Sequence, residues 1–184
     1  MQHFSARRLT FLALSVALIT VCSWISVPLT IPFTLQTFAV CLSAALLGPS
    51  GFWAVLGYIL LGAAGVPVFS GFRGGLGALM GVTGGYIVGF LFTAAIVGFS
   101  VRRFGRGLPA LLLSMAVGVL VCYAFGTAWF MAVYARSTGP LSLGAALGWC
   151  VFPYLLPDAV KILLASVLCR RLAPAWKRMG PGEG

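Results

Sequence analysis

The sequence predicts an all-α integral membrane protein with six transmembrane helices, and three observations lead to this prediction. First, 61% of the 184 residues are hydrophobic and only 8% are charged, whereas a soluble domain carries roughly 25% charged residues. Second, the apolar runs are long and unbroken and do not alternate with a period of two, which favours helices over barrel strands. Third, the basic residues gather at the ends of these runs, as cytoplasmic anchors do. Together these observations exclude a soluble globular domain and a disordered chain.

We expect the six spans at about residues 9–27, 35–47, 51–64, 85–101, 108–134 and 157–170. The first is not a signal peptide in this interpretation, because further apolar segments follow it instead of a polar domain. Gly48-Pro49 ends the second span, and Pro157 opens the last, since proline is favoured at the start of a helix. A glycine-rich connection, residues 65–84, follows the third span, and a short helical piece, residues 141–152, precedes the last.

The distribution of lysine and arginine predicts that both termini are cytoplasmic. With the N-terminus inside, the outer loops hold only Arg73 and Arg136, and Lys161 lies within a span. The other nine lie on the inner side, namely Arg7, Arg8, Arg102, Arg103, Arg106, Arg170, Arg171, Lys177 and Arg178. Cytoplasmic segments carry such an excess, so the net charge of +10 indicates no nucleic-acid partner. We therefore expect one transmembrane domain over residues 1–184, with a helical bundle at 10–172 and a cytoplasmic tail at 173–184.

Small residues recur every four positions in three places. They are Gly77, Gly81, Gly85 and Gly89, then Gly144 and Gly148, then Ala13 and Ala17 on the first span. On a helix such a series forms a smooth stripe that another backbone can approach closely. The stripe is interpreted as packing within the bundle, with a contact between molecules as the alternative.

Asp158 and Lys161 are the only acidic and the only basic residue inside an expected span. Each costs roughly 2.5–3.5 kcal/mol at a helix centre on insertion scales. Residues three apart share a helix face, so the two side chains are expected to meet. They either form an ion pair that locks the bundle or contact a ligand near the outer end of the last helix, and embedded charges favour the ligand role.

A few polar and aromatic side chains near the outer ends of the spans are further candidates for a ligand pocket. These are Thr34, Gln36, Arg73, Tyr86, Tyr123 and Trp129. Thr34 also suits a helix cap, Arg73 a plain surface charge, and the aromatic residues a core or an interface belt. A cluster of aromatic rings beside the one ion pair would suit a ligand that contains a ring.

The chain lacks the residue patterns of an enzyme or a metal protein. It has no GxxxxGK[ST] loop for ATP, and its one histidine, His3, lies in the terminal tail. Acid–base or metal-assisted hydrolysis therefore lacks its parts. The five cysteines have no CxxC spacing and are expected to be small buried residues and not a metal site. We expect no catalytic residue, no metal and no cofactor.

Four runs of residues together resemble one known family. They are IPFTLQTFAV (31–40), LLGAAGVPVFSGFRGGLGALMGVTGGYIVGF (60–90), YAFGTAWF (123–130) and FPYLLPDAVKILLA (152–165). In this order they resemble BioY, the biotin-binding S component of energy-coupling factor (ECF) vitamin transporters, over about residues 10–172. One departure is Val82, where the family usually has proline.

The resemblance implies a function and partners. It implies high-affinity biotin uptake through a multi-pass protein of a bacterial inner membrane, with a biotin site near the outer face. It also implies a transmembrane T component and a pair of cytosolic ATPases, with Ala13 and Ala17 facing the T component. An S component for another vitamin and a ligand-free structural subunit are the alternatives. Homo-oligomerisation is left open.

Two arrangements of biotin fit the spacing of Asp158 and Lys161. In the first, both residues bind the ureido ring through charge-assisted hydrogen bonds, and Arg73 or the Gln36 segment binds the carboxylate. In the second, Lys161 pairs with the carboxylate and Asp158 orients Lys161. Pro28 and Pro32 keep the first outer loop extended, and we expect this loop to cover the pocket.

Overall fold

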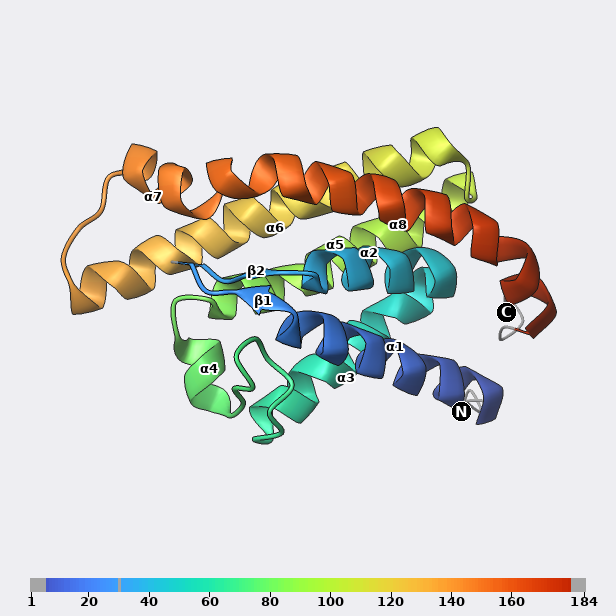
Figure 1. Ribbon diagram of the computed structural model, residues 1–184, viewed down its shortest axis with the longest axis horizontal. Coiled ribbons are helices and arrows are strands. Elements are labelled where there is room, and N and C mark those ends of the chain that lie inside the picture. Colours follow the sequence, from blue (N-terminus) through green and yellow to red (C-terminus); the bar gives the residue numbers. More distant parts are fainter. Residues whose placement is uncertain (1–5, 30, 180–184) are drawn as a thin grey trace.

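The computed structural model describes residues 6–29 and 31–179, with the side chains of 177–179 excepted, and it is almost entirely helical (Figure 1). His3, the side chains of Lys177 and Arg178, and residues 180–184 of the expected tail lie outside this description. The elements in order are α1 (Ala6–Trp24), β1 (Ser26–Val27), β2 (Phe33–Thr34), α2 (Gln36–Leu47), the 3₁₀ turn η1 (Gly48–Ser50), α3 (Gly51–Ala63), α4 (Leu76–Met80), α5 (Gly84–Phe104), α6 (Leu108–Ser137), α7 (Leu143–Cys150) and α8 (Phe152–Met179).

Five helical stretches are long and apolar enough to cross a membrane, whereas the sequence predicted six spans. The difference lies at Gln36–Ala63, which counts as one stretch. The predicted break at Gly48-Pro49 is present as η1, but α2 and α3 have only 12 and 13 residues. At 1.5 Å per residue each rises about 20 Å, less than the roughly 30 Å core of a bilayer.

The chain turns back on itself at η1. A Cβ atom on Gly51 would lie only 2.6 Å from the Cα atom of Ala44, so the start of α3 packs directly against the end of α2. The start of α1 and the end of α8 then lie at the same end of the molecule (Figure 1). Two arginines tie this end together: Arg8 donates to Ser50 Oγ (2.6 Å), and Arg106 donates to the carbonyl oxygens of Ala45 and Leu46 at the end of α2 (both 3.1 Å).

The expected start of the last helix at Pro157 is wrong. Helix α8 begins at Phe152 and contains Pro157 in its interior. Pro153 fits the first turn, where its missing N–H has no intrahelical partner to lose. Pro157 removes the hydrogen bond to the carbonyl of Pro153, and helices in membrane proteins accommodate such a loss. The helix also continues past Arg170 to Met179.

The expected glycine stripe does not lie on one helix. Gly77 belongs to α4, Gly81 ends it in an extended conformation, and Gly85 and Gly89 belong to α5. The last two nevertheless serve close packing, since a Cβ atom on Gly85 would lie 2.2 Å from Trp129 Cβ on α6. This contact is internal to the bundle, as the packing interpretation expected. Gly144 and Gly148 on α7 have no atom within 4 Å of that position.

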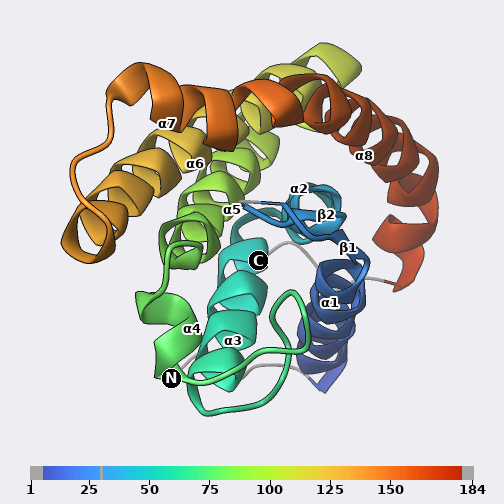
Figure 2. The ribbon, with the colours of Figure 1, turned by 60° about the vertical axis from the view of Figure 1, so that its left-hand side comes forward.

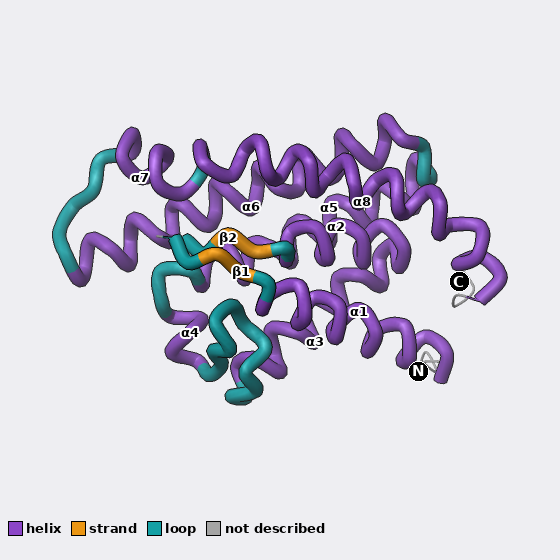
Figure 3. The backbone as a smooth tube through the Cα atoms, viewed as in Figure 1, coloured by secondary structure: helices purple, strands orange, loops and turns teal. Residues whose placement is uncertain are grey.

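A small hairpin interrupts the helical fold between α1 and α2. Strands β1 and β2 pair antiparallel, with Ser26 opposite Thr34 and Val27 opposite Phe33. Figure 3 shows the hairpin between the end of α1 and the start of α2. This pairing gives the segment between α1 and α2 a defined structure, which its prolines alone did not predict.

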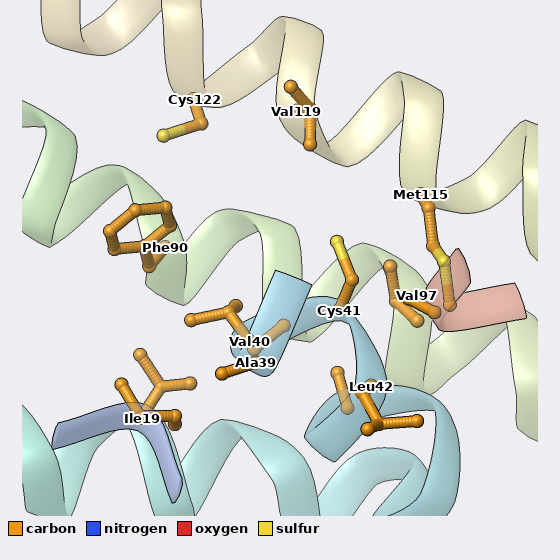
Figure 4. Close-up of a cluster of buried hydrophobic side chains, with 14 of the residues drawn as sticks. Ile19, Ala39, Val40, Cys41, Leu42, Phe90, Val97, Met115, Val119 and Cys122 are labelled. Carbon is orange, nitrogen blue, oxygen red and sulfur yellow. The ribbon is translucent and has the colours of Figure 1, made fainter. Parts of the chain in front are cut away.

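Helix α2 is the centre of the bundle. It contacts α1, α3, α5, α6 and α8, and ten of its 12 residues are buried. In Figure 2, α1 and α3 lie on one side of α2 and α5, and α6, α7 and α8 lie on the other. Side chains from α1, α2, α5 and α6 meet in the core, among them Ile19, Val40, Phe90 and Met115 (Figure 4).

Large apolar side chains cover the outer faces of the long helices. Leu14 on α1, Leu113 on α6 and Leu156 on α8 are 59%, 68% and 77% exposed. A soluble protein rarely exposes apolar surface on this scale. These faces therefore suit contact with lipid chains. The five cysteines are free and buried, as the sequence predicted.

Candidate ligand-binding site

A cavity opens near the hairpin, between α2, α5, α6 and α8. The empty space among its lining side chains measures about 810 Å³, part of it open to solvent. Its walls come from nearly every part of the fold. They comprise Ile31, Pro32, Thr34, Gln36, Thr37, Phe69, Ser70, Arg73, Ala78, Thr83, Tyr86, Ile87, Phe90, Val119, Cys122, Tyr123, Cys150, Tyr154, Asp158 and Lys161.

Asp158 and Lys161 line this cavity as an ion pair. Lys161 Nζ lies 2.7 Å from Asp158 Oδ1, and each residue is only 5% exposed. The contact follows from their spacing of three residues on α8, which puts both on one helix face. The sequence thus predicted the pair itself, but not which groups surround it.

Both members of the pair have partners on other elements. Tyr123 on α6 donates its hydroxyl hydrogen bond to Asp158 Oδ2. Lys161 donates to the carbonyl oxygen of Thr34 (2.6 Å), and its ammonium lies 3.9 Å from the centre of the Phe33 ring. Because a buried charged side chain is costly unless it is paired and hydrogen-bonded, these contacts offset part of the cost of burying the pair.

The two polar candidates at the start of α2 serve different purposes. The hydroxyl of Thr34 accepts a hydrogen bond from the backbone N–H of Gln36 (3.2 Å), while its carbonyl oxygen binds Lys161. The N-cap of α2 is Leu35, so the expected capping role of Thr34 is wrong. Gln36 is 4% exposed, lines the cavity and donates to the hydroxyl of Tyr58 (3.0 Å). Gln36 therefore joins the cavity wall to a buried network on α3.

The remaining candidates lie in three environments. Tyr86 lines the cavity and shares a hydrogen bond with Thr127 (2.9 Å). Arg73 is exposed at the edge of the cavity, and its Nε donates to the carbonyl oxygen of Ser70 (3.2 Å). Trp129 is absent from the cavity lining. Its side chain packs on Gly85, and its Nε1 donates to the carbonyl oxygen of Gly81, just after α4 (3.0 Å). Trp129 thus supports the segment before α5 from behind.

Sequence reasoning missed Tyr154 and Phe33. Tyr154 lines the cavity, donates its hydroxyl hydrogen bond to the carbonyl oxygen of Ile31, and stacks on Phe33 with ring centres 6.5 Å apart. A signal was present, because Tyr154, Asp158 and Lys161 are spaced i, i+4 and i+7 and share a helix face. Placing the helix start at Pro157 hid it.

The hairpin is therefore held to α8 at two points. Tyr154 binds the carbonyl oxygen of Ile31, and Lys161 binds that of Thr34. Phe33 lies between them, stacked on the tyrosine ring and facing the ammonium group. The hairpin and the ion pair are thus parts of one structure.

Comparison with known proteins identifies the family. A sequence model of the BioY family matches residues 1–178. The chain belongs to the BioY family. A Pyrococcus horikoshii relative named "Probable biotin transporter BioY" is 41% identical over 169 residues, covering 91% of this chain and 96% of the relative. The "Biotin transporter BioY" of Thermotoga maritima is 37% identical over 168 residues, covering 90% and 95%.

A solved structure has the same fold. It is described as the S-component for biotin from an ECF-type ABC transporter. It superposes with a TM-score of 0.81 at 25% identity, covering 95% of this chain and 94% of the other. Membership of the BioY family makes the chain a multi-pass membrane transport protein and not an enzyme.

Tyr154→Phe is expected to loosen the hairpin of this BioY protein, because it removes the hydroxyl that binds Ile31 and keeps the ring on Phe33. A nitroxide attached at Val27→Cys, an exposed site on β1, should become more mobile. Tyr134→Phe is the control, since the Tyr134 hydroxyl has no hydrogen-bond partner in the described part of the chain. Equal label mobility in both variants would show that the hairpin is held without this bond.

Proposed function

We propose that this protein is the substrate-binding S subunit for biotin uptake in a bacterial inner membrane. One observation carries the proposal: a buried Asp158–Lys161 pair faces a cavity in a chain whose relatives at 41% and 37% identity are named biotin transporters. An ion pair that served only to stabilise the packing of the helices would not require a cavity beside it. A charged pair at a cavity wall instead suits a ligand with both donors and acceptors.

The proposal includes six membrane passes with both termini cytoplasmic. Reversal of the chain at Gly48–Ser50 and the shared location of the start of α1 and the end of α8 support it (Figure 1). The exposed basic residues at that end, including Arg102, Arg103 and Arg170, have the placement of cytoplasmic anchors. The cavity and the hairpin then face outward, where biotin arrives.

The positions of the charges support the first of the two arrangements of biotin. Asp158 and Lys161 are almost fully buried, whereas Arg73 is exposed at the cavity edge. The neutral ureido ring loses less solvation than the carboxylate when it enters a buried site. The ureido ring therefore binds Asp158 and Lys161 within the cavity, and the carboxylate stays near Arg73. Tyr86 and Tyr123 contribute apolar walls, and Trp129 acts indirectly by supporting the start of α5.

The pair itself provides the test of the function. Asp158→Asn and Lys161→Ala each leave one buried charge without its partner, which typically lowers the stability of the fold by about 3–5 kcal/mol. Each also removes one of the two groups proposed to bind the ureido ring. We expect each variant to lose high-affinity biotin binding, measured by calorimetry on purified protein in detergent.

The double variant Asp158→Asn/Lys161→Met is the control for folding. Removing both charges leaves no unpaired ion, so its melting temperature should recover relative to the single variants, while biotin binding stays lost. Wild-type affinity in a correctly inserted Asp158→Asn protein would reduce the pair to a structural lock. A ligand-free subunit would also show no rise in melting temperature with biotin.

Biotin amide, which lacks the ionised carboxylate, distinguishes the two arrangements. If Lys161 binds the ureido ring, Lys161→Ala should weaken biotin and the amide alike, and Arg73→Gln should weaken biotin only. If Lys161 binds the carboxylate, Lys161→Ala should leave the affinity for the amide unchanged. Arg136→Gln, at the exposed end of α6, is the matched control for removing an outer charge and should change neither affinity.

We further propose that the protein works with a T component and a pair of ATPases. The solved structure with the same fold is an S-component from an ECF-type ABC transporter. Ala13 and Ala17 are exposed on α1, and small residues four apart let another helix approach closely. This face of α1 is therefore proposed to contact the T component.

Ala13→Leu/Ala17→Leu is expected to abolish the increase in biotin uptake that co-expressed T and ATPase subunits give to cells without their own transporter. Binding of biotin to the purified variant should stay normal, because neither alanine lines the cavity. Ala124→Leu/Ala128→Leu is the matched control, as these exposed alanines are also four apart but lie on α6. Uptake that needs no partners, or that survives the α1 variant, would contradict this proposal.

A further inference from the structure

A buried polar network lies behind the cavity and joins four segments of the chain. Gln36 on α2 donates through Nε2 to the hydroxyl of Tyr58 on α3 (3.0 Å). Tyr58 donates to the carbonyl oxygen of Val68 in the loop after α3 (3.1 Å), and Ser23 on α1 donates to the same oxygen (2.5 Å). Tyr58 and Ser23 are 0% exposed. Of the four, only Gln36 lines the cavity.

The hydrogen bonds of this network have one consistent direction. Tyr58 has one hydroxyl proton, which it donates to the Val68 carbonyl, so its oxygen accepts from the Gln36 NH₂ group. With the opposite amide orientation, Tyr58 would donate to Gln36 and would face the Val68 oxygen at 3.1 Å without a proton between them. Ser23 would still donate to Val68, but two buried acceptors in contact are unfavourable.

The orientation of the amide decides what Gln36 offers to a ligand. Its NH₂ group is engaged by Tyr58, and its carbonyl oxygen accepts from no donor among the residues that the structure describes. This oxygen is not completely buried, so a molecule in the cavity can reach it. Since Gln36 is part of the cavity wall, the missing donor is to be supplied by the bound molecule.

We propose that Tyr58 is a positioning residue that holds the Gln36 amide so that its oxygen accepts an N–H of the ligand. The inference rests on the proposed function, because the ureido ring of biotin carries two N–H donors. Asp158 accepts one of them, and Gln36 accepts the other. The site then selects a cyclic urea with both N–H groups intact, and Tyr58 controls this selectivity without touching the ligand.

The test uses two lactam analogues of biotin, in each of which one ureido N–H is replaced by CH₂. One of them lacks the N–H that Gln36 accepts. Wild type should bind this analogue about tenfold or more weakly than biotin, as an unpaired buried acceptor costs on the order of 1–3 kcal/mol. In Tyr58→Phe the discrimination between biotin and this analogue should fall below about threefold. The other analogue should remain discriminated through Asp158.

Two further variants complete the experiment. Gln36→Leu removes the acceptor and keeps Tyr58, so it should lose the same discrimination even if Tyr58→Phe fails to fold. Tyr134→Phe is the control: it removes a hydroxyl on α6, away from this network, and should discriminate between biotin and the lactam as wild type does. A purely structural role for Tyr58 would lower the melting temperature or weaken all ligands equally, without changing the ratio between them.

The outcomes separate this inference from the proposed function. Wild type that does not bind biotin overturns the function, and the inference falls with it. If wild type binds biotin but binds one lactam with the same affinity, the inference alone is overturned. It is also overturned if Tyr58→Phe or Gln36→Leu keeps the wild-type ratio of affinities for biotin and the lactam. Loss of discrimination against one lactam in both variants is the result expected.

Discussion

The ion pair between Asp158 and Lys161 sets the conditions that the rest of the bundle around the cavity meets. Two opposite charges inside an apolar bundle are tolerable only if their remaining hydrogen-bonding capacity is used. Tyr123 supplies a donor for the carboxylate, and the Thr34 carbonyl and the Phe33 ring receive the ammonium group. One electrostatic requirement therefore brings α6, α8 and the hairpin to the same place, and the cavity lies where they meet.

The hairpin depends on that requirement more than on its own pairing. Two strands of two residues each contribute little stability by themselves. The hairpin is held because Lys161 and Tyr154 bind its carbonyl oxygens. Any change in the partners of Lys161 would therefore also change how firmly the hairpin is held. The loop after α3 is anchored separately, through Val68 and the network of Tyr58.

Much of the helical layout was predictable because it depends on local patterns. Apolar runs located the long helices other than α8 to within about three residues at each end, and Gly48-Pro49 marked a real break. The errors arose where a local rule met a tertiary context. Proline at a helix start is a good rule, yet Pro157 lies inside α8 because Pro153 occupies the first turn. The glycine series was regular in sequence but is divided between α4 and α5. Tyr154 was overlooked as a consequence of the first error.

By itself the sequence determined that this chain is a helical membrane protein, that it carries one embedded acid and one embedded base, and that these two meet on a helix face. All three depend on composition or on spacings of a few residues. The tertiary structure alone decided which groups surround the pair, because Tyr123 and Thr34 are 35 and 127 residues away from their partners. It also decided that Trp129 packs on Gly85 outside the cavity, while Tyr58 accepts a hydrogen bond from Gln36 behind it. Those roles depend on how whole helices pack, and no short-range pattern records that packing.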